Sequence, residues 1–249
     1  MNQGRKPLIH GARRGRAPRR SELKNSREGI FQRFLKIGPA KYPDMPARPG
    51  LLFVICGPSG VGKTSLVRAL VARCPQLTLS VSYTTRPPRP GEQDGVAYHF
   101  VSHERFAAMQ AAGEFLESAR VFDHHYGTSA VAVAQALAAG HSVVLEIDWQ
   151  GARQARARLP GCVTVMILPP SVATLRERLA GRGDDEAVIE RRMRDALAEL
   201  GHWSEFDYLV VNDDFERALD DLAAITRAAA LTREHQRAWL QQHLPELLS

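Results

Sequence analysis

The strongest constraint on the fold is a glycine-rich octapeptide between an apolar run and a helical run. The octapeptide, GPSGVGKT at residues 57–64, matches the pattern G-x-x-x-x-G-K-[ST]. It follows the apolar segment LLFVIC at 51–56, a predicted strand, and precedes SLVRALVAR at 65–73, whose periodicity is helical. In this context the N–H groups of the loop turn toward phosphate oxygens, and the helix N-terminus adds positive potential. The sequence therefore predicts a nucleoside triphosphate site between a central strand and its following helix.

The loop also suggests roles for individual side chains. We expect Lys63 to contact the β- and γ-phosphates of the nucleoside triphosphate and the hydroxyl of Thr64 to ligate Mg²⁺. A glycine-rich turn with an exposed lysine is the alternative, and the flanking strand and helix disfavour it. The loop residues expected to bind the nucleoside triphosphate, which the resemblance described below implies is ATP, are Gly57, Pro58, Ser59, Gly60, Val61, Gly62, Lys63 and Thr64.

From Leu51 onward, apolar runs alternate with helical periodicity, which is typical of βαβ units around a parallel sheet flanked by helices. Strands are predicted at residues 51–56, 79–83, 115–121, 142–147, 163–168 and 207–211. Helices are predicted at residues 63–73, 103–112, 129–139, 150–158, 171–180, 186–203 and 215–245. The Pro- and Gly-punctuated stretch 84–101 is expected to form a loop and short strands in a small insertion.

The lengths of the apolar runs and the spacing of the cysteines indicate in which compartment the protein is expected. The longest apolar runs, near 51–56 and 163–168, have about six residues, whereas a membrane-spanning helix needs about 20, so we expect no membrane partner. Cys56, Cys74 and Cys162 are widely spaced and form no C-x-x-C pair, so we expect reduced thiols and a cytoplasmic protein. The opening of the chain lacks the apolar region of a secretory signal.

Positive charge is concentrated in residues 1–50, which hold 13 Lys and Arg against 3 Asp and Glu. The remainder holds 20 against 24, so nucleic-acid binding by the core domain is not expected. We expect residues 1–48 to be a basic, disordered N-terminal extension ahead of one domain at 49–249. The extension is interpreted either as a solvated stretch or as sequence upstream of a true start at Met45; a nucleic-acid, membrane or targeting role is the alternative.

A second candidate anion site follows the first. Residues 82–92, SYTTRPPRPGE, carry Arg86 and Arg89 three positions apart, stiffened by three prolines, and Tyr98 lies shortly beyond. Guanidinium groups held in this way suit bidentate contacts with phosphate. The segment predicts a second phosphorylated substrate, and a solvated basic loop is the alternative.

Several segments together resemble the guanylate kinase family of P-loop nucleoside monophosphate kinases. They are GPSGVGKT, SYTTRPPRPGEQDGVAYHF, FLE, YGTS, LEIDWQGA, LRERLAGRG and VVNDD, in this order between residues 51 and 245. The resemblance implies an α/β fold: a P-loop NTPase core with a parallel sheet, a small α+β GMP-binding insertion and a helical lid. The implied boundaries are a core at 49–81, 129–170 and 204–249, a GMP-binding region at 82–128 and a lid at 171–203.

The resemblance implies which residues bind GMP. The GMP phosphate would be held by Arg86, Arg89, Tyr98 and Tyr126, and the guanine would be read by Ser82, Glu117 and Thr128. The chemistry agrees, because a carboxylate accepts from guanine N1–H and the N2 amine, whereas adenine offers neither donor. Bound adenine would leave Glu117 unpaired, a cost of about 1–3 kcal/mol or more.

Two acids end the predicted strand SVVLEID, where parallel sheets place their ligands. The resemblance places Glu146 near the guanine nucleotide. It places Asp148 beside GMP and in the position that organises Mg²⁺, where the carboxylate is expected to contact the ion through a water molecule. Capping of the helix that begins near Gln150 is an alternative role for Asp148.

The lid carries the remaining implied roles. Arg178, Arg182 and Arg192 match lid arginines that neutralise charge on the transferring phosphoryl group, although GRGDDEAVI looks one residue shorter than the usual lid loop. The alternative is an exposed pair of charged helices. Asn212 matches an adenine-side residue, and His124 and His125 are interpreted as surface substitutions without a metal role. The implied catalytic residues are Lys63, Asp148, Arg178, Arg182 and Arg192.

The resemblance implies Mg²⁺-dependent phosphoryl transfer from ATP to GMP, giving ADP and GDP without a covalent enzyme intermediate. A related kinase acting on a ribose bisphosphate is one alternative, but it should lack the guanine-reading set. A non-catalytic module that binds a phosphorylated protein is another, although such modules usually have degraded phosphate-binding loops. A homo-oligomer is possible.

Overall fold

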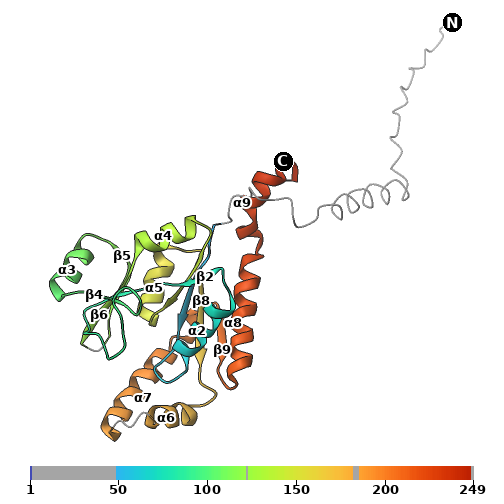
Figure 1. Ribbon diagram of the computed structural model, residues 1–249. Coiled ribbons are helices and arrows are strands. Elements are labelled where there is room, and N and C mark those ends of the chain that lie inside the picture. The colour runs from blue at the N-terminus through green and yellow to red at the C-terminus, as the bar shows by residue number, and fades with distance from the viewer. Residues whose placement is uncertain (2–48, 122, 182–184, 248–249) are drawn as a thin grey trace. The chain divides into compact units, whose positions relative to one another are not determined.

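The computed structural model describes Met1 and residues 49–121, 123–181 and 185–247 (Figure 1). A five-stranded sheet lies at its centre in the order β2-β7-β1-β8-β9, and every neighbouring pair is parallel. The strands are β1 (Leu52–Cys56), β2 (Leu77–Leu79), β7 (Ser142–Glu146), β8 (Val163–Leu168) and β9 (Tyr208–Val211). The predicted α/β fold with a parallel sheet is confirmed.

Alternating side chains of β1 explain why helices cover both faces of this sheet (Figure 1). Phe53 and Ile55 enter a core formed with α2 (Lys63–Arg73) and α8 (Phe215–Ala230). Leu52, Val54 and Cys56 enter a second core on the other face. That core includes residues of α4 (Ala130–Ala138) and α5 (Trp149–Arg158). All five residues of β1 are buried, so the strand that leads into the phosphate-binding loop is fixed from both sides.

A second, mixed sheet in the order β4-β3-β6-β5 forms the insertion. Its strands are β3 (Tyr83–Thr84), β4 (His99–Phe100), β5 (Phe115–Val121) and β6 (His124–Ser129). The helix α3 (His103–Ala111) packs on it through Phe106 and Met109, which contact Phe115. Strand β6 was not predicted, because its residues HHYGTS lack apolar alternation and its order comes from pairing with β3 and β5.

The predicted strand 79–83 is wrong, because the chain passes between sheets within it. The N–H of Ser80 still donates to the carbonyl oxygen of Val144, 3.0 Å away, at the edge of the main sheet. Two residues later, the carbonyl oxygen of Ser82 accepts from the N–H of His99 at 2.9 Å, in the second sheet. One apolar run therefore supplies the end of β2 and the start of β3.

The segment expected to form a lid, residues 171–203, contains the helices α6 (Val172–Ala180) and α7 (Glu186–Leu200). They pack through a small core of Leu175, Leu179, Ile189, Met193 and Ala196. The predicted helix 186–203 ends earlier, at Leu200, where Gly201 caps it, and a short 3₁₀ helix η1 (Trp203–Glu205) follows.

The predicted helix 215–245 is two helices, α8 and α9 (Arg233–His243), followed by the 3₁₀ turn η2 (Pro245–Leu247). Thr232 causes the break: its backbone is extended and its hydroxyl accepts from the N–H of His235 at 3.4 Å, capping α9. Among the described residues, no helix is both long and apolar enough to cross a membrane. The expectations for residues 2–48 lie outside the described part of the chain.

Candidate active site

The phosphate-binding loop turns between the buried end of β1 and the first residue of α2. Gly62, the last loop residue, has φ 96° and ψ 10°, in the left-handed region that favours glycine. A Cβ at this position would lie 2.5 Å from the side-chain nitrogen Nδ2 of Asn212. Both the backbone conformation and the close neighbour therefore require glycine here.

Polar groups of β1, α2 and β7 converge beside this loop. The Lys63 ammonium donates to the carbonyl oxygen of Ile147 at 3.3 Å, and the Thr64 hydroxyl donates to the carboxylate of Glu146. The register of the sheet explains this meeting, because Ile55 of β1 pairs with Glu146 of β7. The carboxyl ends of two parallel strands thus bring a cation, a hydroxyl and a carboxylate together.

Asp148 lies just beyond these groups, as the N-cap of α5. Its carboxylate accepts from the N–H of Gly151 at 2.9 Å, which is the capping role that the sequence left open. Its carbonyl oxygen accepts from the thiol of Cys56 at 3.3 Å. Asp148 is half-buried, so the cap also fixes a carboxylate beside the loop.

The three residues expected to read guanine lie together in the insertion. Glu117 is only 3% exposed, and its carboxylate accepts from the Thr128 hydroxyl at 2.6 Å. The hydroxyls of Ser82 and Thr128 are 3.5 Å apart. Burial, followed by the nearby charge of Asp148, raises the pKa of Glu117 to about 7 against the opposing hydrogen bond from Thr128. The set is thus a buried carboxylate bonded to the Thr128 hydroxyl, with the Ser82 hydroxyl next to Thr128.

Helix α5 presses directly against this carboxylate. A Cβ on Gly151 would lie 2.7 Å from Oε2 of Glu117 and 3.0 Å from the side chain of Ile147. Glycine at the third residue of α5 therefore permits the buried position of Glu117. The same helix start, through Asp148, faces the phosphate-binding loop, so one turn links both parts of the site.

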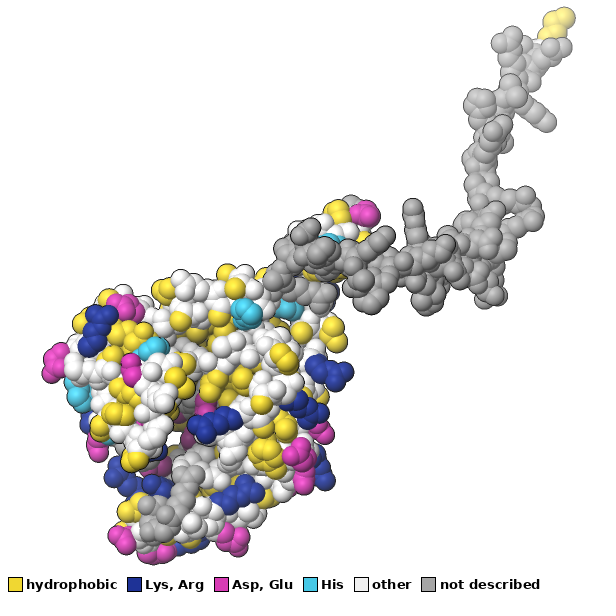
Figure 2. Space-filling model, in the orientation of Figure 1, with side chains coloured by type: hydrophobic (Ala, Val, Ile, Leu, Met, Phe, Trp, Pro, Cys, Tyr) yellow, Lys and Arg dark blue, Asp and Glu magenta, His cyan; other side chains and the backbone are white. Residues whose placement is uncertain are grey.

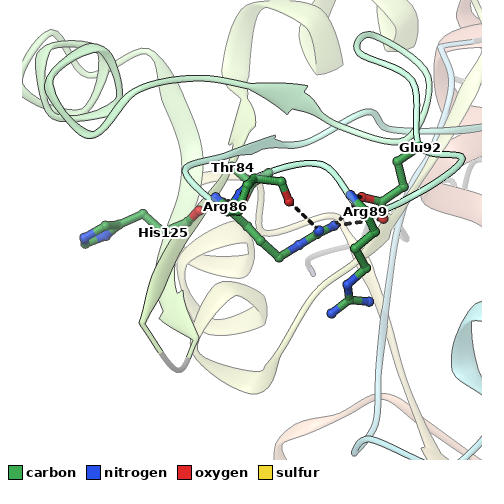
Figure 3. A network of polar contacts seen from close by, with 6 residues as sticks. Thr84, Arg86, Arg89, Glu92 and His125 are labelled. Carbon is green, nitrogen blue, oxygen red and sulfur yellow. Dashed lines mark hydrogen bonds and ion pairs between the residues drawn. The ribbon is translucent and has the colours of Figure 1, made fainter.

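The arginines of the second candidate anion site differ in their surroundings (Figure 3). Arg86 is 9% exposed, and its Nη2 donates to both carboxylate oxygens of Glu92, at 2.8 and 2.9 Å. Its guanidinium carbon lies 5.5 Å from the ring centroid of Tyr98. Arg89 is exposed, and its guanidinium turns away from the Arg86–Glu92 pair. Arg86 is thus held in place, whereas Arg89 extends from the loop.

Glu92 organises the loop as well as Arg86. It accepts from the N–H of Arg89 at 2.7 Å, and this hydrogen bond, with Arg86 adding to it, lowers the pKa of Glu92 against the effect of burial. The neighbouring Thr84 hydroxyl accepts from the N–H of Arg86 at 3.1 Å and donates to the carbonyl oxygen of His125 at 3.0 Å. The loop between β3 and β4 is therefore closed by a carboxylate and tied to β6 (Figure 3).

The two tyrosines expected at the GMP phosphate are neighbours. The rings of Tyr98 and Tyr126 lie 5.8 Å apart, edge to face. Burial raises the pKa of Tyr98, and the charge of Glu146 adds to this increase, which places the phenol within electrostatic range of the main-sheet carboxylate. The phenols thus lie between the Arg86 loop and the end of β7.

The lid contacts the phosphate-binding loop through α6. Arg178 donates from Nη2 to the carbonyl oxygen of Asn212 at 3.1 Å and from Nη1 to that of Val61 at 3.5 Å. Asn212 is 6% exposed and donates from Nδ2 to the same Val61 oxygen at 2.7 Å. Arg192 is half-buried on α7, and Arg182 lies outside the described residues. Arg178 and Asn212, the expected adenine-side residue, thus both donate hydrogen bonds to the loop itself.

Sequence reasoning missed Glu199, on the last turn of α7. Its Oε1 atom is buried and has no hydrogen-bond partner among the described residues. Burial raises the pKa of Glu199; the Lys63 charge and the N–H of Gly57 oppose this rise, and Asp148 adds to it. In the sequence, Glu199 is one of many charged residues of a helical segment. Only the approach of α7 to the phosphate-binding loop, which the structure shows, distinguishes it from the others.

His124 and His125, which the sequence analysis interprets as surface residues, are half-buried in β6. The ring of His125 lies 5.4 Å from that of Phe106 and 5.9 Å from that of His103. Pairing of β6 with β5 places His125 on the sheet face that α3 covers, which the sequence pattern could not show.

The space-filling view shows Lys and Arg side chains on both sides of a hollow between the lobe that carries α3 and the helices α6 and α7 (Figure 2). Concentrated positive charge beside a hollow attracts anionic ligands. The site therefore combines a phosphate-binding loop, a buried carboxylate with two hydroxyls, and an arginine–tyrosine cluster.

Comparisons with known proteins agree with this geometry. The family model described as guanylate kinase matches residues 50–229. The chain is 58% identical to the guanylate kinase of Alkalilimnicola ehrlichii over 201 residues, covering 80% of this chain and 99% of the relative. It is 56% identical to the guanylate kinase of Nitrosococcus oceani over 200 residues, covering 80% and 98%.

A solved structure is similar as well. The crystal structure of guanylate kinase from Anaplasma phagocytophilum superposes with a TM-score of 0.67 at 31% sequence identity. The match covers 81% of this chain and 98% of that chain. The similarity therefore extends over the central sheet, the insertion and the lid together.

Proposed function

The chain belongs to the guanylate kinase family, and from this premise we propose that it transfers the γ-phosphoryl group of ATP to GMP, giving ADP and GDP. The observation that carries the proposal is the buried carboxylate of Glu117 beside Thr128, in the same site as an intact phosphate-binding loop. Neither a ribose bisphosphate nor a phosphorylated protein needs such a carboxylate. Both alternatives therefore lose their support.

Glu117 reads the guanine base. Its ionised carboxylate accepts from guanine N1–H and the N2 amine, and Thr128 and Ser82 complete the polar edge. Two new donors stabilise the ionised form, so GMP binding lowers the pKa of Glu117 from its raised value. Adenine presents an acceptor at N1 and no amine at C2, so AMP leaves the buried carboxylate unpaired.

Arg86, Arg89, Tyr98 and Tyr126 hold the GMP phosphate. The Glu92 carboxylate keeps Arg86 oriented before the ligand arrives, which reduces the ordering cost of binding. Arg89 is exposed and adds a second guanidinium from the same loop. The phosphate oxygen of GMP is thereby aimed at the γ-phosphorus for in-line attack.

The loop from Gly57 to Gly62 and Lys63 bind the ATP phosphates, and Arg178, Arg182 and Arg192 neutralise charge on the transferring group. Arg178 already lies at the loop, bonded to the carbonyl oxygen of Val61. No side chain forms a covalent intermediate, because positioning and charge stabilisation suffice for this transfer.

The residues at the start of α2 and the end of β7 fit Mg²⁺. The Thr64 hydroxyl faces the Glu146 carboxylate, and Asp148 follows two residues later, so the donors are oxygen atoms. The described residues hold no group of three or more His, Cys, Asp or Glu that could ligate a metal alone. This agrees with Mg²⁺, which binds through one or two carboxylates together with substrate phosphates. When bound, the ion supplies charge neutralisation at the β- and γ-phosphates.

We place this reaction in the cytoplasm, where both nucleotides are available. All three cysteines are buried and free, as expected in a reducing compartment.

An acceptor screen tests the proposed function. Purified protein is given Mg·ATP with GMP, AMP, ribose 1,5-bisphosphate or no acceptor, and ADP formation is followed by a coupled assay. We expect rapid turnover with GMP and at least a hundredfold lower rate with the others. Equal turnover with GMP and AMP, or turnover only with the ribose bisphosphate, would refute the proposal.

A further inference from the structure

The side chain of Asn212 holds the phosphate-binding loop. The residue follows β9, and its backbone N–H donates to the carbonyl oxygen of Leu168 at 2.9 Å, which fixes its position at the end of the sheet. Its amide Nδ2 donates to the carbonyl oxygen of Val61 at 2.7 Å. Both Asn212 and Val61 are buried, at 6% and 0% exposed, so this hydrogen bond is shielded from water.

This hydrogen bond sets the orientation of one peptide plane. In a trans peptide the carbonyl of residue 61 and the N–H of residue 62 point in opposite directions. Because Asn212 draws the carbonyl of Val61 toward itself, the N–H of Gly62 is directed to the opposite side of the loop. The left-handed backbone of Gly62, with φ 96°, belongs to the same arrangement.

Two further observations show that the arrangement is built for this contact. A Cβ on Gly62 would lie 2.5 Å from Nδ2 of Asn212, so glycine at this position admits the amide. Arg178 supports the same group from α6, with 3.1 Å to the carbonyl oxygen of Asn212 and 3.5 Å to that of Val61. Donors from two segments distant in sequence thus hold one loop carbonyl.

We propose that Asn212 is a positioning residue for the phosphates of the donor nucleotide, which it controls by aiming the N–H of Gly62 at a bound phosphate. The proposal rests on the proposed function only in taking the loop as the triphosphate site. Its distinctive consequence is that Asn212 acts on the phosphates whatever base they carry. A direct contact with adenine would instead act on ATP alone.

Binding of a base-free phosphate chain separates these roles. ATP, inorganic tripolyphosphate and GMP are each titrated calorimetrically into wild type, Asn212→Asp and Asn212→Ala. Asp keeps the shape of Asn but places an oxygen against the Val61 carbonyl, and Ala removes the donor. We expect ATP and tripolyphosphate to bind about 10- to 100-fold more weakly by the same factor, with GMP affinity unchanged.

Asp213→Asn is the matched control, because Asp213 is exposed, adjacent and bonded to Arg217 rather than to the loop. It should leave all three affinities unchanged. Weakened ATP binding with unchanged tripolyphosphate binding in the Asn212 variants would overturn the proposal in favour of an adenine contact. A lower melting temperature with unchanged affinities would overturn it in favour of a purely structural role.

A measurement on the wild-type protein keeps the proposal testable if the variants do not fold. In amide NMR spectra, the Gly62 resonance should move downfield when tripolyphosphate is added. An unmoved Gly62 amide at saturating tripolyphosphate would overturn the proposal. If the Asn212 variants weaken tripolyphosphate binding as expected but the wild type does not phosphorylate GMP, the proposed function fails and the role of Asn212 stands.

Discussion

At the scale of single residues, the site depends on carboxylates in unusual surroundings. Glu117 is buried beside a hydroxyl, and Glu92 is fixed by the guanidinium of Arg86 and the N–H of Arg89. The first has a raised pKa and the second a lowered one, so the same functional group serves two tasks. In the proposed function, Glu117 accepts hydrogen bonds from the guanine base, whereas Glu92 orients Arg86 for the GMP phosphate.

The raised pKa of Glu117 predicts how GMP binding depends on pH. The group must be ionised to accept from guanine, and its pKa in the free protein is about 7. Between pH 8 and pH 6, the dissociation constant for GMP should therefore rise by about tenfold as protons compete. Calorimetric titrations at several pH values measure this change. The phosphate of GMP also titrates near pH 6, so Glu117→Gln serves as the reference protein. If the dissociation constant for GMP changes equally with pH in both proteins, Glu117 is not the group that reads guanine.

The same shift has a consequence for stability. Because burial raises the folded pKa from 4.5 to about 7, the folded protein holds more protons than the unfolded chain between these values. The contribution of Glu117 to the free energy of unfolding thus falls as pH rises through this window. Glu117→Gln should raise the free energy of unfolding at pH 8 by about 1–3 kcal/mol, measured by urea denaturation. A lower stability of the variant at pH 8 would show that burial of the ionised Glu117 carboxylate does not destabilise the folded protein.

Neutralising Glu92 tests the Arg86 pair. Glu92→Gln removes the charged partner of Arg86, so the guanidinium loses its orientation before GMP binds. We expect KM for GMP to rise about 5- to 30-fold with KM for ATP unchanged, measured in steady-state assays. Glu114→Gln, an exposed carboxylate in the same insertion, is the control. Equal changes in both KM values would place the effect outside the GMP phosphate site.

The residue types of the site could be predicted from sequence, because motif order and chemistry select them. The partners could not: Glu199 and the Asn212–Val61 contact depend on helices and strands that are distant in sequence. Asp148 shows the remaining ambiguity, since a helix cap and a ligand position use the same carboxylate at the same place in the chain.

At the scale of elements, the close approach of α5 to the insertion determines whether the proposed guanine pocket around Glu117 can form. The helix begins at Trp149, and Gly151 in its first turn leaves space for Glu117. The first residues of α5 and its N-cap Asp148 thereby contact both the end of β1 that leads into the phosphate-binding loop and the proposed guanine pocket.

Gly151→Ala tests this packing. The added Cβ would lie 2.7 Å from Oε2 of Glu117, so the carboxylate must move. We expect GMP affinity to fall about tenfold or more while ATP affinity stays unchanged, measured by calorimetry. Gly161→Ala is the matched control, because a Cβ there meets nothing within 4 Å. Unchanged GMP affinity in Gly151→Ala would mean that α5 does not constrain Glu117.

Element positions followed from sequence where hydrophobic periodicity is strong. The helix 63–73 and the strand 163–168 agree with α2 and β8 residue for residue. Errors arose where tertiary pairing overrides local pattern: β6 lacks alternation, and the run 79–83 divides between two sheets. A single threonine cap at Thr232, within a continuous helical pattern, separates α8 from α9.

At the scale of the whole molecule, the lid is anchored to both halves of the site. Leu179 of α6 would meet a Cβ on Gly60 at 3.0 Å, so α6 packs on the phosphate-binding loop. Beyond α7, the ring of His202 stacks on Trp149 of α5 at 3.7 Å. The two ends of the lid segment therefore contact the loop and the helix that supports the guanine pocket.

The catalytic domain should function without the basic extension. The family match begins at residue 50, and a chain that starts at Met45 keeps every described strand and helix. We expect this shorter protein to retain kcat and both KM values within about twofold, because its site residues and their neighbours are unchanged. Steady-state assays of the two proteins side by side provide the measurement. A tenfold loss in the shorter protein would show that the extension takes part in catalysis.

The most direct test of the account follows the label of γ-³²P-ATP in the presence of GMP and Mg²⁺. If the phosphate-binding loop binds ATP and the Glu117 pocket binds GMP as proposed, the label appears in the β-phosphate of GDP, in amounts equal to the ADP formed, and AMP accepts none. Label found only in inorganic phosphate, or ADP formed at the same rate without GMP, would contradict the account.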